Sequence, residues 1–248
     1  MKLSATDEGA DWLRNERIVY RSLTGAPFLP RLIGWHDDGE RPALAIEDMS
    51  GAEWPPPWTP ARIDAVRESL AQVARTPPPA ALPSASQSQF DLNGWPEIAT
   101  DPGPFLDLGM CSAAWLGRAL PVLDDAARSA DLGGDSLLHM DVRSDNLCVI
   151  GDRAIFIDWN WACRGNAAFD LAAWLPSLHA EGGPAPETLM PEAGAFAALL
   201  AGYFCAHAPR PPISLAPHVR PLQLAQARTA LPWAARALGL PMPVDTAG

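Results

Sequence analysis

The sequence predicts an α+β protein in which a small α+β lobe is followed by a mostly helical lobe with one buried hairpin. Three observations predict this class. A stretch with helical periodicity precedes two short strand-like runs at the beginning of the chain. Farther along, two apolar runs flank a Gly-Asp turn and indicate a tight hairpin. Most other apolar segments have the length and spacing of helices.

The first predicted element is a helix over residues 4–24. Apolar side chains recur there at steps of three and four residues, and Gly25 follows as a stop signal. Leu32–Trp35 and Pro42–Ile46 have the composition of short strands separated by a turn. We therefore expect the helix to lie on a small antiparallel sheet.

Three consecutive prolines, Pro55–Pro57, mark the end of this first part. We divide the chain into an N-terminal lobe, residues 1–51, and a helical C-terminal lobe, residues 52–248. Thr59-Pro60 then supplies an N-cap and a first-turn proline for a helix that ends near Arg75.

The rest of the C-terminal lobe is expected to consist of helices and loops around the hairpin. Residues 76–91 are rich in Pro and Ser and predict a surface loop, and residues 160–165 predict another. Four further helices are predicted over residues 111–130, 167–178, 191–206 and 217–238. The first of these four is expected to bend at Pro121.

The hairpin is formed by Leu147–Ile150 and Ala154–Ile157 around the turn Gly151–Arg153. Polar residues stand just before and just after it, where a rigid scaffold can aim their side chains. Singly, Asp and Asn are also common in turns. Together with their apolar flanks, these residues indicate a site: His139, Asp141, Asn146 and Asp158.

Composition excludes several classes of function. The net charge of −11 and the pI of about 4.8 argue against a nucleic-acid partner. They favour a cationic small molecule, although acidity is also a common solubility device. The sequence contains neither a signal-peptide pattern nor an apolar run long enough to span a membrane. Four cysteines without a CxxC pair predict reduced thiols in a cytoplasmic protein, which we expect to be a monomer or a homodimer.

The spacing of the polar residues suits phosphoryl transfer. That chemistry needs a carboxylate to orient the attacking hydroxyl and oxygen ligands for the metal ions that neutralise the phosphates. Asp141 could accept the proton of the substrate hydroxyl. Asn146 and Asp158 offer a small set of oxygen ligands, which suits Mg²⁺.

The same residues resemble the aminoglycoside phosphotransferase family of the protein-kinase-like superfamily. The catalytic loop of that family has the form H-x-D-x4-N, as in His139–Asn146, and its metal motif ends a strand, as in Phe156–Trp159. A G-x3–4-D-L-A segment follows, as in Gly165–Ala172. The resemblance implies a two-lobe fold, ATP and Mg²⁺ as ligands, and transfer of the γ-phosphoryl group to a hydroxyl. It also implies that His139 braces the loop and that Asp170 supports it.

The resemblance extends to the N-terminal lobe. In the family, a strand bears a phosphate-binding Lys, and the next helix carries its partner Glu; Lys2 and Glu16 fit that spacing. A hinge then binds adenine through its backbone groups. The matching hinge residues here are Glu47, Asp48 and Met49.

One departure concerns the glycine-rich phosphate loop. In the superfamily two strands and this loop precede the Lys, whereas the sequence begins one residue before Lys2. We therefore expect either a truncated N-terminal lobe with weaker ATP binding, or a start site placed too late. The loss of the loop leaves open a second hypothesis, a pseudokinase that binds a nucleotide or ligand as a regulatory protein. A metal-dependent phosphohydrolase is a third, but it would require more His and Asp ligands than the sequence offers.

Overall fold

The computed structural model describes residues 1–4, 6–86 and 92–243. The chain groups into two compact units. The first consists of Met1–Ser88 with Leu132–Trp174, and the second of Gln89–Asp131 with Leu175–Gly248. Short sheets and helices combine in the first unit, so the predicted α+β class is confirmed. The boundaries of these units differ from the lobe boundary expected between residues 51 and 52. The division into those two lobes stays a prediction.

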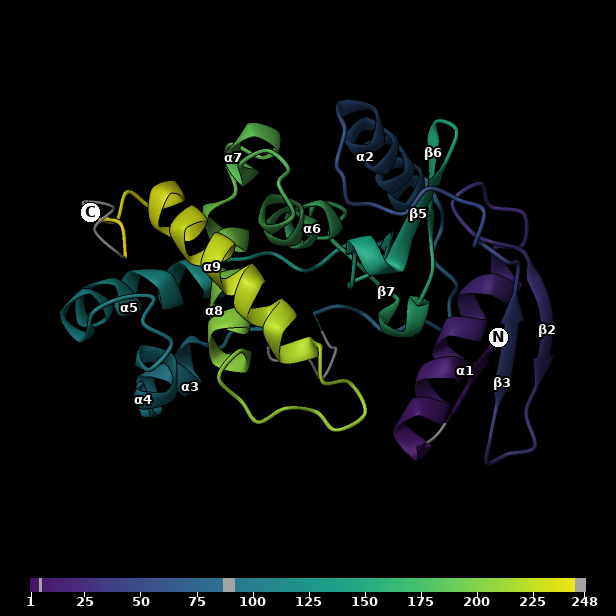
Figure 1. Ribbon diagram of the computed structural model, residues 1–248, viewed down its shortest axis with the longest axis horizontal. Helices are drawn as coiled ribbons and strands as arrows, with labels where there is room; N and C mark the ends of the chain where they lie inside the picture. The colour runs from purple at the N-terminus through teal and green to yellow at the C-terminus, as the bar shows by residue number, and fades with distance from the viewer. Residues whose placement is uncertain (5, 87–91, 244–248) are drawn as a thin grey trace. The chain divides into compact units, whose positions relative to one another are not determined.

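The first unit begins with an antiparallel sheet in the order β1 (Lys2–Leu3), β3 (Ala43–Ile46) and β2 (Leu32–His36). Helix α1 (Asp7–Ser22) runs alongside this sheet (Figure 1). The Thr6 hydroxyl caps the helix by accepting a hydrogen bond of 3.0 Å from the N–H of Gly9. The predicted helix and both predicted strands are confirmed, although residue 5 of the helical prediction lies outside the described residues.

Helix α2 (Pro60–Arg75) confirms the cap prediction. The Thr59 hydroxyl accepts a hydrogen bond from the N–H of Arg62, and Pro60 occupies the first turn. The helix packs on the hairpin that follows residues 139–146. One polar contact joins them, from the N–H of Ala154 to the buried Ser69 hydroxyl at 3.0 Å. Because both groups are buried, this bond satisfies the N–H of Ala154, which would destabilise the fold if it were buried without an acceptor.

The hairpin consists of β5 (Leu147–Ile150) and β6 (Arg153–Phe156). Arg153 pairs with Ile150, so the turn has two residues instead of the expected three. Its first residue, Gly151, has a φ of +63°, a conformation that glycine adopts at little cost. The hairpin prediction is confirmed with a tighter turn.

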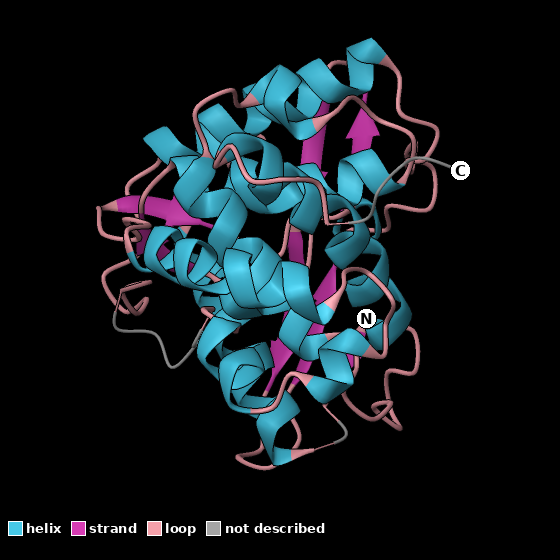
Figure 2. Ribbon diagram, turned by 90° about the vertical axis from the view of Figure 1, so that its left-hand side faces the viewer, coloured by secondary structure: helices cyan, strands magenta, loops and turns pink. Residues whose placement is uncertain are grey.

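The predicted loop over residues 160–165 is wrong. It contains most of a 3₁₀ turn, η2 (Trp159–Trp161), and a short strand, β7 (Cys163–Gly165). Strand β7 pairs antiparallel with β4 (Ser136–Leu138) and forms with it one of the three small sheets in the described part of the chain; strands are magenta in Figure 2. The strand was not foreseeable because three residues are too few to establish a pattern, and its partner is distant in sequence.

The Pro/Ser-rich prediction for residues 76–91 is confirmed in part. The described portion, residues 76–86, contains no helix and forms one bridge to β7. It is not entirely superficial, because the side chains of Leu82 and Ala85 are buried. The N–H of Ala85 donates to the carbonyl of Arg164 at 2.8 Å, which ties the loop down. Residues 87–91 lie outside the described residues.

The described part of the second unit is helical. Its α5, α8 and α9 confirm predicted helices, and so does α6, which begins in the first unit; the short α3, α4 and α7 were not predicted. None of the helices in the described ranges is long and apolar enough to cross a membrane. The helices are α3 (Trp95–Thr100), α4 (Gly103–Leu106), α5 (Ala113–Arg128), α6 (Ala168–Ala180), α7 (Pro186–Leu189), α8 (Gly194–His207) and α9 (Val219–Ala237).

Close packing of α3 against α8 predicts a large effect at Gly202. A Cβ atom at this position would lie 2.8 Å from Nε1 of Trp95, whose N–H donates to the carbonyl of Ala198 at 2.9 Å. We expect Gly202→Ala to lower the free energy of unfolding by about 1–3 kcal/mol through overpacking. Urea denaturation would measure this change.

Gly117 in α5 is the matched control, since it is also a helical glycine. A Cβ added there meets no atom within 4 Å. Gly117→Ala should therefore raise the unfolding free energy by up to about 1 kcal/mol, because alanine favours the helix. Equal effects at the two glycines would contradict the packing argument.

Candidate active site

His139 is the first residue of the predicted catalytic loop, His139–Asn146, and is fully buried. Its Nδ1 accepts a hydrogen bond of 3.2 Å from the N–H of Asp141, so its Nε2 carries the proton and donates to the carbonyl of Ile157 at 2.8 Å. Burial lowers the pKa of His139 to about 4, which keeps the ring neutral. A neutral ring bonded at both nitrogens can brace the loop but cannot act as an acid or base near pH 7.

Asp170, in α6, supports the backbone of the same loop. Its carboxylate accepts hydrogen bonds from the N–H groups of His139 at 2.6 Å and Met140 at 2.9 Å. Met140 has a φ of +71°, an uncommon conformation for a residue with a side chain. Burial raises the pKa of Asp170 to about 6, against the opposing effect of these two bonds. The structure thus places both predicted support residues, His139 and Asp170, on the loop.

Asp141 and Asn146 are in direct contact. The Nδ2 of Asn146 donates to a carboxylate oxygen and to the carbonyl of Asp141, both at 2.9 Å. This leaves Oδ1 of Asn146 without a protein donor among the described hydrogen bonds. The Asp141 side chain is 26 % exposed, so a solute can reach it. Burial raises the pKa of Asp141 to about 6, against the opposing charge of Arg143.

Asp158 follows β6 and returns to the catalytic loop. The N–H of the preceding residue, Ile157, donates to the carbonyl of Asn146 at 2.9 Å, which fixes the two segments together. Asp158 itself has a φ of +64°. Strained backbone of this kind is typical of functional sites, and Asn or Asp tolerates it best among residues with side chains.

Lys2 reaches Asp158 and Glu16 at the same time. Its Nζ lies 2.9 Å from a carboxylate oxygen of Asp158 and 2.9 Å from one of Glu16. Glu16 is buried, and the Tyr20 hydroxyl also donates to it at 3.2 Å. Burial alone would lower the pKa of Lys2, but the two carboxylates raise it above its ordinary value. The sequence-predicted pair therefore meets, and Asp158 joins it.

The predicted hinge, Glu47 to Met49, presents backbone groups in a defined pattern. The N–H of Glu47 is bonded to the carbonyl of Arg31 at 2.8 Å, and the Glu47 carboxylate accepts from the Arg31 side chain. The carbonyl of Met49 accepts from the indole N–H of Trp54 at 3.1 Å. No described hydrogen bond uses the carbonyl of Glu47 or the N–H of Met49. The Met49 side chain packs on Cys148 and Ile155 of the hairpin.

Comparison with known proteins identifies the family. The sequence profile of the phosphotransferase enzyme family matches residues 2–175, which is more than half of the chain. The chain belongs to the phosphotransferase enzyme family. The match includes Lys2, the hinge and the whole catalytic loop. A comparison with curated protein sequences gives no significant match.

Solved structures share the fold of this phosphotransferase. A choline/ethanolamine kinase family protein from Mesorhizobium loti has a TM-score of 0.62 at 15 % identity, over 96 % of this chain and 85 % of that one. An aminoglycoside phosphotransferase from Alicyclobacillus acidocaldarius has a TM-score of 0.55 at 15 % identity, over 96 % and 82 %. A mutant of aminoglycoside phosphotransferase APH(4)-Ia, in complex with AMP-PNP and hygromycin B, has a TM-score of 0.57 at 20 % identity, over 92 % and 83 %. At these identities the likeness establishes a protein-kinase-like fold.

The donor set of the phosphotransferase suits Mg²⁺. It combines the free amide oxygen of Asn146 with the carboxylate of Asp158, which is 38 % exposed. Magnesium prefers such hard oxygen ligands, and with few of them from protein it retains water and takes phosphate oxygens. The residues present therefore fit this ion.

The sequence holds one further signal for Lys2, which the resemblance already placed in the site. It is the only lysine in the sequence, whereas arginine is frequent. Arg143 lies 3.3 Å from Asp141 and bonds Asp145 through Nε at 3.0 Å. The structure brings the Arg143 guanidinium against the predicted catalytic carboxylate, a contact that the sequence pattern alone did not indicate.

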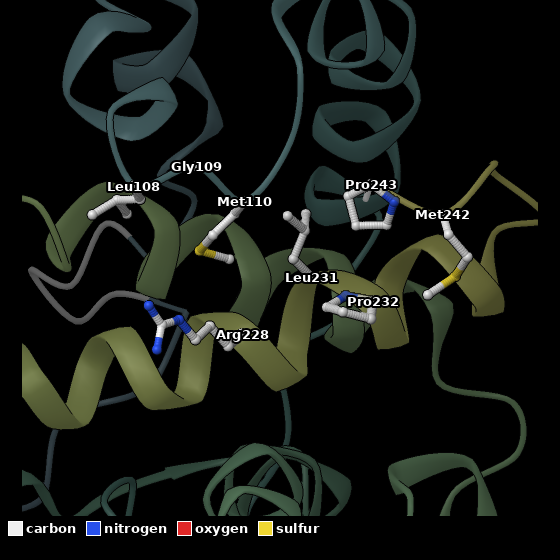
Figure 3. Close-up of a pocket in the computed structure, with 8 residues that line it drawn as sticks. All are labelled: Leu108, Gly109, Met110, Arg228, Leu231, Pro232, Met242 and Pro243. Carbon is white, nitrogen blue, oxygen red and sulfur yellow. The ribbon is translucent and has the colours of Figure 1, made fainter. Parts of the chain in front are cut away.

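The second unit contains an open pocket of about 240 Å³ (Figure 3). Its walls are mainly apolar, with Arg228 as the charged side chain. No residue predicted for the active site lines it, so we do not assign the phosphotransferase chemistry to this pocket. The lining residues are Leu108, Gly109, Met110, Arg228, Leu231, Pro232, Met242 and Pro243.

Proposed function

We propose that this protein is an ATP-dependent kinase that transfers the γ-phosphoryl group to a hydroxyl group of a small molecule. One observation carries the proposal: the Lys2 ammonium bridges Glu16 and Asp158, and the residue before Asp158 bonds the loop that contains Asp141. A cation suited to phosphate, a carboxylate suited to a metal ion and a partly exposed carboxylate thus lie in one unit. These are the parts that phosphoryl transfer requires.

Asp141 would orient the acceptor and receive its proton. The acceptor oxygen forms a bond to the γ-phosphorus while the bond from that phosphorus to the β–γ bridging oxygen breaks, and ADP leaves. Asn146 holds one oxygen of this carboxylate, and the other lies 3.3 Å from Arg143 at the partly exposed side, where the hydroxyl would bind beside that guanidinium. Lys2 would bind the phosphates while Glu16 holds it in place. Asn146 and Asp158 would hold Mg²⁺, which supplies charge neutralisation for the phosphates.

The hinge supports adenine as the base. The carbonyl of Glu47 can accept from the exocyclic amine of adenine, and the N–H of Met49, two residues on, can donate to the adjacent ring nitrogen. Guanine presents the opposite order, an acceptor beside a donor. The side chain of Asp48 is held locally by Ser50, so backbone groups are the main contacts that this segment offers.

The class of acceptor is proposed from the charge of the protein and from the descriptions of its solved relatives. The net charge of −11 favours a cationic small molecule. Solved relatives are described with hygromycin B or as choline/ethanolamine kinase family proteins, which agrees with a hydroxyl acceptor of this kind. The cysteines carry free thiols, consistent with a cytoplasmic protein that works as a monomer or homodimer.

Turnover tests the proposal. The protein would be incubated with Mg-ATP and a panel of hydroxyl compounds that includes amino sugars and amino alcohols, and phosphorylated product would be detected by mass spectrometry. We expect acceptor-dependent ADP release with at least one of them. Binding of Mg-ATP without product across the panel would instead favour the regulatory pseudokinase.

The pH dependence of turnover reports on Asp141. The carboxylate must be ionised to accept a proton, so kcat/KM for ATP should fall as pH drops through about 6, where burial has placed this pKa. The Arg143 charge lowers that pKa, so Arg143→Gln should move the acidic limb to higher pH. Arg153→Gln, on the exposed end of the hairpin, is the control and should leave the limb in place. A limb that moves to lower pH in Arg143→Gln would contradict this account.

A further inference from the structure

One face of α1 is fastened to the segment that follows Asp158. The Nδ2 of Asn15 donates to the carbonyl of Asn160 at 2.6 Å and to the carbonyl of Ala162 at 3.4 Å. The rings of Trp12 and Trp161 lie 5.0 Å apart, centroid to centroid. These contacts join parts of the chain that are 145 residues apart in sequence.

The same face of α1 carries the partner of Lys2. Trp12, Asn15 and Glu16 are spaced at i, i+3 and i+4, which places them side by side on a helix. On the other side of the contact, Asp158 immediately precedes η2, the turn that receives Trp12 and Asn15. The contact by which Asn15 holds α1 against η2 therefore helps to determine the separation between the carboxylates of Glu16 and Asp158.

These two carboxylates repel each other unless a cation lies between them. In the structure the Lys2 ammonium lies 2.9 Å from each. When Lys2 turns toward a phosphate, part of that neutralisation is lost. An uncharged amide bonded to two carbonyls is unaffected by the change, so it can keep α1 in place throughout.

We infer that Asn15 is a positioning residue, whose side-chain amide holds α1 so that Lys2 and Glu16 stay in register with Asp158. The effect of Asn15 on catalysis rests on the proposed function, whereas its contact with the two carbonyl groups does not depend on that function. Asn15→Leu removes both donors at nearly constant volume. Asn15→Asp keeps the shape but sets a carboxylate against two carbonyl oxygens, and it should have the larger effect.

Lys2 provides a readout that needs no nucleotide. Because it is the only lysine in the sequence, an acylating reagent modifies a single ε-amine, and the α-amine of Met1 serves as internal reference in mass spectrometry. The ion-paired ε-amine should react slowly in the wild type. We expect Asn15→Leu to increase its acylation rate severalfold relative to the reference, Asn15→Asp to increase it more, and Asn15→Gln, which retains an amide donor, to recover part of the protection.

A kinetic readout separates positioning from general stability. We expect Asn15→Leu to raise the KM for Mg-ATP by about tenfold, with the acceptor KM unchanged. Arg21→Ala, an exposed change near the end of the same helix, should alter neither the acylation rate nor the KM.

The inference is overturned if the Lys2 acylation rates of Asn15→Leu and Asn15→Asp match that of the wild type. It is equally overturned if the variants lose melting temperature while the KM for Mg-ATP stays constant, since that is the behaviour of a purely structural contact. If the wild type does not bind Mg-ATP, the proposed function fails, and the acylation rates still decide whether Asn15 positions Lys2.

Discussion

Asp141→Asn should reduce the rate of phosphoryl transfer by about 10³-fold, within the range that a positioned general base contributes. Asparagine keeps the size of the side chain and can still accept the hydrogen bond from Asn146. It cannot take the proton of an acceptor hydroxyl. Because the substitution leaves Lys2, Glu16 and Asp158 unchanged, Mg-ATP should bind as tightly as before. Steady-state kinetics and calorimetry would measure the two quantities.

Asp145→Asn is the matched control for this experiment. Asp145 is also a carboxylate of this loop, and it bonds Arg143 at 3.0 Å, but its side chain is 48 % exposed and no described hydrogen bond joins its carboxylate to the Asn146 side chain. We expect its substitution to change kcat by only a fewfold. A similar loss in both variants, or full activity in Asp141→Asn, would show that the role given to Asp141 is wrong.

Asp158→Asn should weaken binding of Mg-ATP by about 10²-fold, comparable to the loss of one charge-stabilising group in an active site. Asparagine tolerates the left-handed backbone at this position, where φ is +64°, so the change removes charge without adding strain. One metal-binding carboxylate is lost, and Lys2 keeps only Glu16 as its carboxylate partner. The dissociation constant with and without Mg²⁺ is the quantity to measure, because the magnesium dependence should largely disappear.

The control for Asp158 is Asp152→Asn, in the exposed turn of the same hairpin. It removes an equal charge close in sequence but away from Lys2, and nucleotide affinity should stay within about twofold, as for an ordinary surface substitution. If Asp158→Asn behaves like this control, the metal site has been placed on the wrong residue.

The elements that the sequence predicted best have strong local signals. Thr59-Pro60 is a cap and first-turn pair whose chemistry does not depend on distant contacts, and α2 begins and ends where it indicated. The hairpin was recognisable because Gly151 lies between two apolar runs. Long segments rich in apolar residues likewise became α5, α8 and α9.

The elements that were missed depend on tertiary contacts. Strand β7 and its partner β4 are each three residues long, and only their pairing makes them strands. Helices α3 and α4 begin near prolines, in a segment that has no sustained periodicity. Their folding is set by packing, as at the close approach of Gly94 to Gly202. A pattern of residue types does not contain such information.

The candidate site also has a part that the sequence predicted and a part that it did not. The proximity of Asp141, Asn146 and Asp158 was predictable because a short loop and a hairpin hold them. The meeting of Lys2 with Glu16 was expected from family resemblance, and the structure places them 2.9 Å apart. The contact of Asn15 with Asn160 could not be read, because a side chain that bonds a distant carbonyl leaves no periodic trace in the sequence.

Calorimetric titration of the wild-type protein with ATP, in the presence and absence of Mg²⁺, tests the central claim most directly, because it needs no knowledge of the acceptor. The structure predicts saturable binding that requires Mg²⁺, is retained in Asp141→Asn and is lost in Asp158→Asn. No binding at millimolar nucleotide, or binding that is equally tight without Mg²⁺, would contradict the assignment of this site to ATP-dependent phosphoryl transfer.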